Sequence, residues 1–163
     1  GEGAGAMTPI DIVAIAEEVA ELYEPAAQDA GFTLTLITAP TPPVKGSREL
    51  VSQAVANFLD NALKYAEGGS RIELKVEPTR NGGAMLSVAD DGPGVKPEDR
   101  ARIFERFVRL EESRSTPGSG LGLSLVSAIA RAHGATIELK DGLKRAGPGG
   151  AGLRIVMTFP HAV

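Results

Sequence analysis

One amphipathic stretch, residues 53–65 with the sequence QAVANFLDNALKY, restricts the possible folds more than any other part of the chain. At ~100° per residue of an α-helix, its polar side chains fall within one narrow stripe beside Tyr65: Gln53, Asn57, Asn61 and Lys64. Around them lies a wide apolar surface, made of Leu50, Val51, Ala54, Val55, Phe58, Leu59, Ala62 and Leu63. Such a surface is typical of a helix that packs against a core. The stretch therefore predicts a helix with a packing side and a carboxamide side.

The carboxamide side carries two asparagines one turn apart, Asn57 and Asn61, followed by Lys64. Asparagine is a poor residue for a helix interior because its side chain competes for nearby backbone groups. A single surface asparagine is usually only solvated, but two in this arrangement need another reason. Neutral oxygens next to one ammonium group suit a site that holds a hard cation together with a polyanion.

Composition limits the classes of protein that need to be considered. The chain has 163 residues, of which 42% are hydrophobic and 23% charged, as expected for one globular domain. A net charge of -4 without a basic patch argues against direct binding of nucleic acid. The lack of cysteine excludes disulfides and cysteine metal sites. No run of ~18 apolar residues could cross a membrane, so we expect this part of the protein to lie in the cytoplasm, even if a parent protein is anchored in the inner membrane.

The hydrophobic periodicity predicts four helices and five strands. The helices are expected over residues 10–29, 50–65, 99–107 and 121–133, and the strands over 32–37, 71–77, 84–89, 136–140 and 153–159. Ser47 is the expected N-cap of the helix with the asparagines, and Pro25 predicts a break or kink near Glu24. Asn81 and Gly82 predict a hairpin turn. This order predicts an α+β two-layer sandwich, with a mixed, mostly antiparallel sheet covered on one face by helices.

A second candidate for binding is DDGPGV, residues 90–95, at the carboxyl end of a predicted strand. A buried carboxylate at Asp90 accepts hydrogen bonds only, so it suits the exocyclic amine or a ring N–H of a purine. Gly92 and Gly94 would let the backbone approach a flat base or turn sharply. An ordinary turn remains the simpler alternative, because Asp-Gly and Pro-Gly are common turn pairs.

A third candidate is GSGLGL, residues 118–123, at the entrance of the last predicted helix. Glycines in this position expose backbone N–H groups at the positive end of a helix, which is a phosphate-binding arrangement, although a glycine-rich hinge is an equally good reading. The intervals do not fit a dinucleotide fingerprint, and no P-loop sequence is present. The preceding residues 109–119 predict a mobile loop. Together, a polar helix, a carboxylate and a glycine loop specify a purine nucleotide site.

Four motifs in this order resemble those of the catalytic ATP-binding domain of bacterial sensor histidine kinases, which act in two-component phosphorelays. Residues 57–65 resemble the N box, 90–94 the first glycine box, 104–107 the F box and 118–123 the second glycine box. The resemblance implies the Bergerat fold of GHKL-type ATPases, an α/β sandwich. We therefore expect residues 1–8 to be a cloning remnant or linker and residues 9–163 to form the catalytic ATP-binding domain.

The resemblance also implies a role for each motif residue. Magnesium would be held through Asn61 with help from Asn57, Lys64 would lie near the phosphates, and Tyr65 near the sugar or base. Asp90 would read the adenine amino group, and Gly92 and Gly94 would line the base pocket. Arg109 would face the γ-phosphate. The closing part of the ATP lid would consist of Gly118, Gly120, Leu121, Gly122 and Leu123.

The activity implied is that of an ATP-dependent protein histidine kinase that presents the γ-phosphate to a histidine on a separate dimerisation domain. The two histidines, His133 and His161, do not fit the phosphoacceptor. His133 lies at a helix end, where capping or packing is the better interpretation. The resemblance implies a dimerisation domain and a downstream response regulator as partners. The helix at residues 10–24 would be where the domain joins the dimerisation helices. We expect the isolated domain to be a monomer.

Related ATPases offer an alternative interpretation. The gyrase, mismatch-repair and heat-shock-90 ATPases carry a water-activating glutamate one turn before the magnesium asparagine, where this chain has Asn57. A carboxamide is a poor general base, so phosphoryl transfer, which depends on positioning and charge stabilisation, fits better than hydrolysis. An anti-sigma-factor kinase and a nucleotide-binding regulatory module without kinase activity are the other readings.

Overall fold

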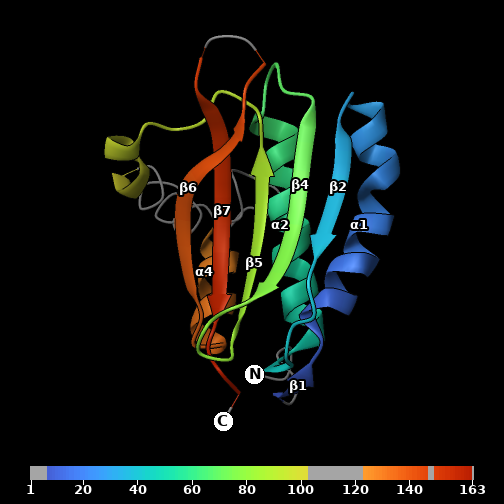
Figure 1. Ribbon diagram of the computed structural model, residues 1–163, viewed down its shortest axis with the longest axis vertical. Coiled ribbons are helices and arrows are strands. Elements are labelled where there is room, and N and C mark those ends of the chain that lie inside the picture. Colours follow the sequence, from blue (N-terminus) through green and yellow to red (C-terminus); the bar gives the residue numbers. More distant parts are fainter. Residues whose placement is uncertain (1–6, 103–122, 147–148, 163) are drawn as a thin grey trace.

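The computed structural model describes residues 7–102, 123–146 and 149–162. They form two layers, a five-stranded sheet and a layer of helices on one of its faces (Figure 1). The helices are α1 (Ile12–Asp29), α2 (Arg48–Tyr65) and α4 (Leu123–Ala132), with a short 3-10 turn η2 (Pro97–Asp99). In sheet order, the strands are β2 (Thr33–Thr38), β4 (Arg71–Pro78), β5 (Ala84–Asp90), β7 (Ala151–Phe159) and β6 (Thr136–Lys144).

The sheet is mixed, as the sequence predicts. β2 runs parallel to β4, while the pairs β4–β5, β5–β7 and β6–β7 are antiparallel. The turn between β4 and β5 contains Gly82 at φ 87°, and β5 ends at Asp90. The predicted α+β two-layer sandwich is therefore confirmed, together with the hairpin that brings Asp90 to a strand end.

One local prediction differs from the structure, and one small sheet was not predicted. Of the break or kink predicted near Glu24, the structure excludes the break, because α1 continues through Pro25. Val19 and Ala27, on either side of the proline, are buried in the same core, and this shared packing stabilises the helix across the missing hydrogen bond. The sequence also did not reveal a small antiparallel sheet of β1 (Thr8–Ile10) and β3 (Val44–Gly46), because three-residue strands show too little alternation to be recognised.

The core lies between the helices and the inner face of the sheet. α2 contributes its whole predicted apolar face, of which six residues are buried: Val51, Ala54, Val55, Phe58, Leu59 and Ala62. They belong to the same hydrophobic cluster as Ile72, Leu74 and Val76 of β4. Because this packing fixes the rotation of α2 about its axis, it also fixes where the asparagines point. None of the helices in the described ranges has the length and hydropathy needed to cross a membrane.

The remaining element predictions agree to within a few residues, where they can be compared. β6 and β7 are longer than expected and flank a connection at residues 145–150. Gly134 follows α4 at φ 63°, as expected for a residue past a helix end. Of the predicted helix at 99–107 only the start is described, as η2 and the residues up to 102. The predicted mobile loop at 109–119 lies outside the described residues.

Candidate functional site

Helix α2 places the two asparagines in different surroundings. Ser47 is the N-cap of the helix, and its Oγ accepts a hydrogen bond from the Leu50 N–H at 3.3 Å. Asn57 is half-buried and Asn61 is buried, with 8% of its surface exposed. Within the described part of the chain, the buried Nδ2 of Asn61 has no hydrogen-bond partner. A buried donor without a partner costs about 1–3 kcal/mol, so this position indicates a site that a ligand completes.

Lys64 and Tyr65 follow on the exposed end of α2. The Lys64 Nζ lies 5.3 Å from the centroid of the Tyr65 ring, a distance at which an ammonium group and an aromatic face attract each other. Tyr65 is 45% exposed. One cation and one aromatic ring are therefore available to a molecule that approaches this end of the helix.

Asp90 is buried at the end of β5 and accepts two backbone hydrogen bonds at one oxygen. The N–H groups of Gly92 and Leu153 both donate to its Oδ1, at 2.9 and 3.3 Å. Its Oδ2 receives no hydrogen bond from the described residues, which leaves this oxygen as a free acceptor. Burial raises the pKa of Asp90, the two N–H groups lower it, and the negative charge of Asp91 raises it further; the result is a raised pKa.

Glycines allow the backbone to pass close to Asp90. A Cβ on Gly92 would lie 2.5 Å from the Ala66 Cα, and one on Gly94, which has φ 71°, would lie 2.3 Å from the Ala151 oxygen. A Cβ on Gly152 would lie 2.5 Å from Oδ1 of Asp90. The backbone therefore lies close to its neighbours at Gly92 and Gly94, while their predicted approach to a flat base stays a prediction. The sequence gave no indication of Gly152, because that glycine comes from a strand far away in sequence.

Asp91 is a further buried carboxylate that sequence reasoning missed. It accepts hydrogen bonds from the backbone N–H groups of Ser70 and Arg71 at 2.8 and 2.9 Å. Burial alone would raise the pKa of Asp91, but the hydrogen bonds from Arg71 and Ser70 outweigh burial and hold the pKa below its usual range. The doubled aspartate before Gly92 was the available signal, since two adjacent acidic residues repel each other unless each has its own partners.

These groups meet at one end of the molecule. The C-cap of α2, Ala66, contacts Gly92, and Figure 1 shows the C-terminal end of α2 and the tip of β5 at the same edge. The structure therefore brings Asn61, Lys64 and Tyr65 to the end of the sheet that carries Asp90. Leu123 is the first residue of α4. The other predicted site residues lie outside the described residues: Arg109, Gly118, Gly120, Leu121 and Gly122.

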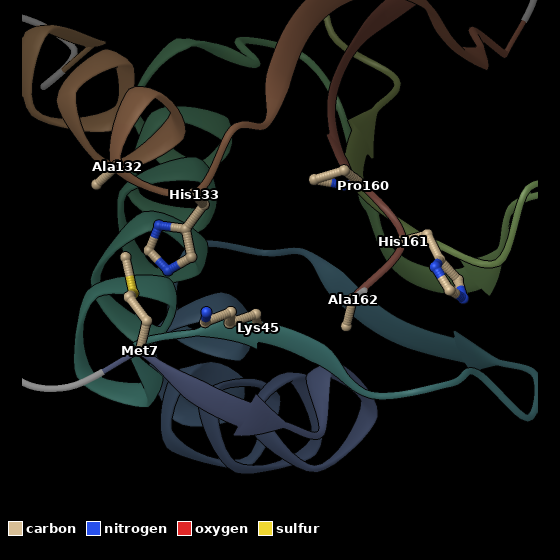
Figure 2. Close-up of a pocket in the computed structure, with 7 residues that line it drawn as sticks. All are labelled: Met7, Lys45, Ala132, His133, Pro160, His161 and Ala162. Atoms are coloured by element: carbon tan, nitrogen blue, oxygen red, sulfur yellow. The ribbon is translucent and has the colours of Figure 1, made fainter.

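The opposite end of the fold contains a cavity around His133 (Figure 2). It is lined by Met7, Lys45, Ala132, His133, Pro160, His161 and Ala162. His133 is buried, and its Nε2 accepts the N–H of Ser47 at 3.0 Å while Nδ1 lies 2.7 Å from the Ile129 oxygen. Its ring also meets Phe159 edge to face, with centroids 5.8 Å apart. The packing role predicted for His133 is confirmed.

Comparison with known proteins places the chain in a family. The family described as "Histidine kinase-, DNA gyrase B-, and HSP90-like ATPase" matches residues 46–163. The histidine-protein kinase/phosphatase MprB of Mycolicibacterium smegmatis is 32% identical over 158 residues, which are 96% of this chain and 32% of that protein. The chain spans about a quarter to a third of the length of the curated relatives that it matches.

Two solved structures share the fold over 96% of this chain. Full-length ShkA in complex with AMPPNP has a TM-score of 0.76 at 34% identity, with 31% of its chain covered. The mycobacterial sensor histidine kinase MprB has a TM-score of 0.71 at 31% identity, with 98% of its chain covered. These relatives favour the histidine kinases over the gyrase, mismatch-repair and heat-shock-90 ATPases. The chain belongs to the histidine kinase-, DNA gyrase B- and HSP90-like ATPase family, and within it to the catalytic domains of bacterial sensor histidine kinases.

Proposed function

We propose that this domain binds ATP with magnesium and presents the γ-phosphate to a histidine on a dimerisation domain of the same protein. The observation that carries the proposal is the buried Asn61 amide, which has no partner among the described residues and lies at the end of α2 next to the Asp90 turn. That ShkA, a structural neighbour, was solved with AMPPNP also supports it. A response regulator would then receive the phosphoryl group from the histidine.

Asp90 would select the base. Its Oδ2 accepts no hydrogen bond from the described residues, whereas Oδ1 is held by the Gly92 and Leu153 N–H groups. A free carboxylate oxygen matches the exocyclic amino group of adenine, which donates hydrogen bonds. Guanine has a carbonyl oxygen at this position, and two acceptors facing each other repel. We therefore infer a preference for adenine over guanine nucleotides.

The donor set of α2 fits magnesium. Asn57 and Asn61 supply carboxamide oxygens on one side of the helix, and Mg²⁺ prefers oxygen ligands and keeps several positions for water and phosphate. A 180° rotation of the buried Asn61 amide exchanges its oxygen and nitrogen, so the position can present either a metal ligand or a donor to a phosphate. When bound, the ion neutralises charge on the phosphates. Because Asn57 cannot act as a general base that activates water, we expect slow hydrolysis of ATP. The γ-phosphate then stays available for transfer.

The exposed residues next to the asparagines complete the inferred site. The Lys64 ammonium, one turn beyond Asn61, would contact the phosphates as a mobile positive charge. Tyr65, which is partly exposed next to it, offers a ring face to the sugar or base. Arg109 and the glycines at 118–122 remain proposed γ-phosphate and lid residues by resemblance to the family.

Titration calorimetry with ADP or ATP, with and without magnesium, tests the binding step. We expect binding that requires magnesium and prefers adenine, and no detectable binding at millimolar nucleotide would contradict the proposal. Transfer is tested by adding the dimerisation domain of the same protein in trans with ATP and measuring acid-labile phosphohistidine. Fast, steady release of phosphate by the domain alone, without phosphohistidine, would show that it is a hydrolase instead.

A further inference from the structure

We propose that Asp91 is a positioning residue for the base site: it ties the α2–β4 loop, residues 66–70, against Gly92, and so fixes the orientation in which Asp90 distinguishes adenine from other purines. This inference rests on the proposed function. It concerns a residue that does not itself face the nucleotide.

Both oxygens of Asp91 are occupied by the protein. Oδ1 accepts the backbone N–H groups of Ser70 and Arg71 at 2.8 and 2.9 Å. Oδ2 accepts the Ser70 hydroxyl at 3.3 Å and the Arg71 Nε at 3.4 Å. The residue is only 5% exposed. Each oxygen of Asp91 therefore accepts two hydrogen bonds from Ser70 and Arg71, and its carboxylate acts as the anchor for the loop.

The anchored loop presses directly against the turn that follows β5. A Cβ on Gly69 would lie 2.6 Å from Oδ1 of Asp91, and a Cβ on Gly92 would lie 2.5 Å from the Ala66 Cα. Neither position has room for a side chain. Arg71 extends the connection to β6, because its Nη2 donates to the Lys144 oxygen. One carboxylate thus joins the loop after α2, the turn after β5 and the last hairpin.

The anchored loop affects the Asp90 carboxylate through Gly92. The Gly92 N–H is the closer of the two donors to Oδ1 of Asp90, at 2.9 Å, and the backbone of Gly92 rests on Ala66 at the start of the anchored loop. If the loop moves away, Gly92 loses this support and its N–H no longer holds Oδ1 in place. The Asp90 carboxylate can then rotate, and Oδ2 no longer points in one fixed direction. Selection between bases should suffer more than contact with the phosphates.

Nucleotide selectivity of Asp91 variants tests the proposal. Calorimetry with magnesium compares ADP with inosine diphosphate, in which an oxygen replaces the amino group. We expect Asp91→Ala to lower the ratio of the two affinities about tenfold, equivalent to about 1.4 kcal/mol. Asp91→Asn should restore most of the ratio, since its amide oxygen can still accept the Ser70 and Arg71 N–H groups. A role in overall stability alone would weaken both nucleotides equally.

Gly69→Ala provides an independent variant that keeps Asp91 itself. Its Cβ would collide with Oδ1 of Asp91 and should lower the same ratio, so it decides the matter if Asp91→Ala does not fold. Glu67→Ala is the control, because Glu67 is an exposed residue of the same loop. An unchanged ratio in the folded Ala variants, or an Asn variant no better than Ala, would overturn the inference. If the unmodified chain fails to bind ADP, the proposed function has failed instead.

Discussion

The two ends of helix α2 lie at opposite ends of the molecule (Figure 1) and handle buried polar groups differently. At its N-terminal end, the Ser47 N–H binds Nε2 of His133, whose Nδ1 lies against the Ile129 oxygen. At its C-terminal end, the Nδ2 of Asn61 is buried without a partner in the described structure. A satisfied polar group contributes to folding, whereas an unsatisfied one costs free energy unless a ligand binds. The first end stabilises the fold, and we propose the second as the binding end.

Close packing does not distinguish the two ends. A Cβ on Gly46 would lie 2.7 Å from the His133 ring, just as a Cβ on Gly92 would lie 2.5 Å from Ala66. Backbone therefore approaches its neighbours equally closely in both places. The difference lies in the hydrogen bonds, and substitutions at each end should separate stability from nucleotide affinity.

The largest expected effect is on binding at Asn61. We expect Asn61→Ala to abolish binding of magnesium-ADP at millimolar nucleotide, because the buried metal and phosphate ligand is lost. The free energy of unfolding should change by less than about 1 kcal/mol, since the substitution removes no hydrogen bond of the Asn61 Nδ2 to the described residues. Calorimetry and urea unfolding measure the two quantities. Gln53→Ala, on the exposed start of the same polar stripe, serves as the control, and normal affinity in Asn61→Ala would refute the metal assignment.

The converse result is expected at His133. His133→Ala leaves the buried Ser47 N–H without its acceptor and opens a cavity next to Phe159, so the free energy of unfolding should fall by about 2–4 kcal/mol. Urea unfolding measures this loss. Affinity for ADP, measured below the unfolding transition, should stay within about twofold because Asn61 and Asp90 are far from this end. The exposed His161, changed to Ala, should have little effect on either quantity. A large loss of affinity without loss of stability would show that the two ends are coupled.

A smaller effect on affinity is expected at Asp90. Asp90→Asn should weaken ATP binding by about 1–3 kcal/mol, the cost of mispairing a buried polar group. The free energy of unfolding should not fall in parallel, since the substitution also removes a buried charge next to Asp91. Calorimetry with ATP and GTP checks the assignment, and equal affinities of the unmodified chain for the two nucleotides would argue against it.

The sequence predicted elements and single residues better than it predicted relations between distant segments. The face of α2 and the cap at Ser47 follow from local periodicity and side-chain chemistry, and both are confirmed. The position of Asp90 at a strand end follows from the hairpin signal. In contrast, the support of Asp91 by Ser70 and the fit of Gly152 against Asp90 join segments 21 and 62 residues apart. No local pattern encodes such contacts, because they arise only when strands pair in the sheet.

Tertiary packing also explains why α1 does not break at Pro25. The local rule, that proline interrupts a helix, holds for an isolated segment. In the folded chain the apolar stripe of α1 continues on both sides of the proline and packs on one core. Tertiary packing therefore keeps α1 continuous, and this packing could not be predicted from the sequence of the segment alone.

The smallest expected effect is that the adjacent aspartates, Asp90 and Asp91, change the stability of the fold in opposite directions as the pH falls. Burial raises the pKa of Asp90 in the folded chain, so the fold binds a proton there more tightly than the unfolded chain does, and protonation of Asp90 favours folding as the pH falls. The pKa of Asp91 is lowered, so the stability that its ionised form contributes is present above its unfolded pKa and is lost as the pH falls through its folded pKa. The two contributions have opposite signs.

Of the two aspartates, Asp90 should be the one whose protonation weakens nucleotide binding. If Asp90 contacts the adenine amino group as proposed, its ionised form is the stronger acceptor, so protonation should weaken ADP binding, at a pH above the ordinary range of an aspartate. Calorimetry between neutral and mildly acidic pH measures this decline. Asp90→Asn should remove it. Asp91→Asn should keep the decline but move it to lower pH, because the negative charge next to Asp90 is gone. The same acid decline in Asp90→Asn as in the unmodified chain would mean that another group controls binding, and that the free Oδ2 of Asp90 does not face the base.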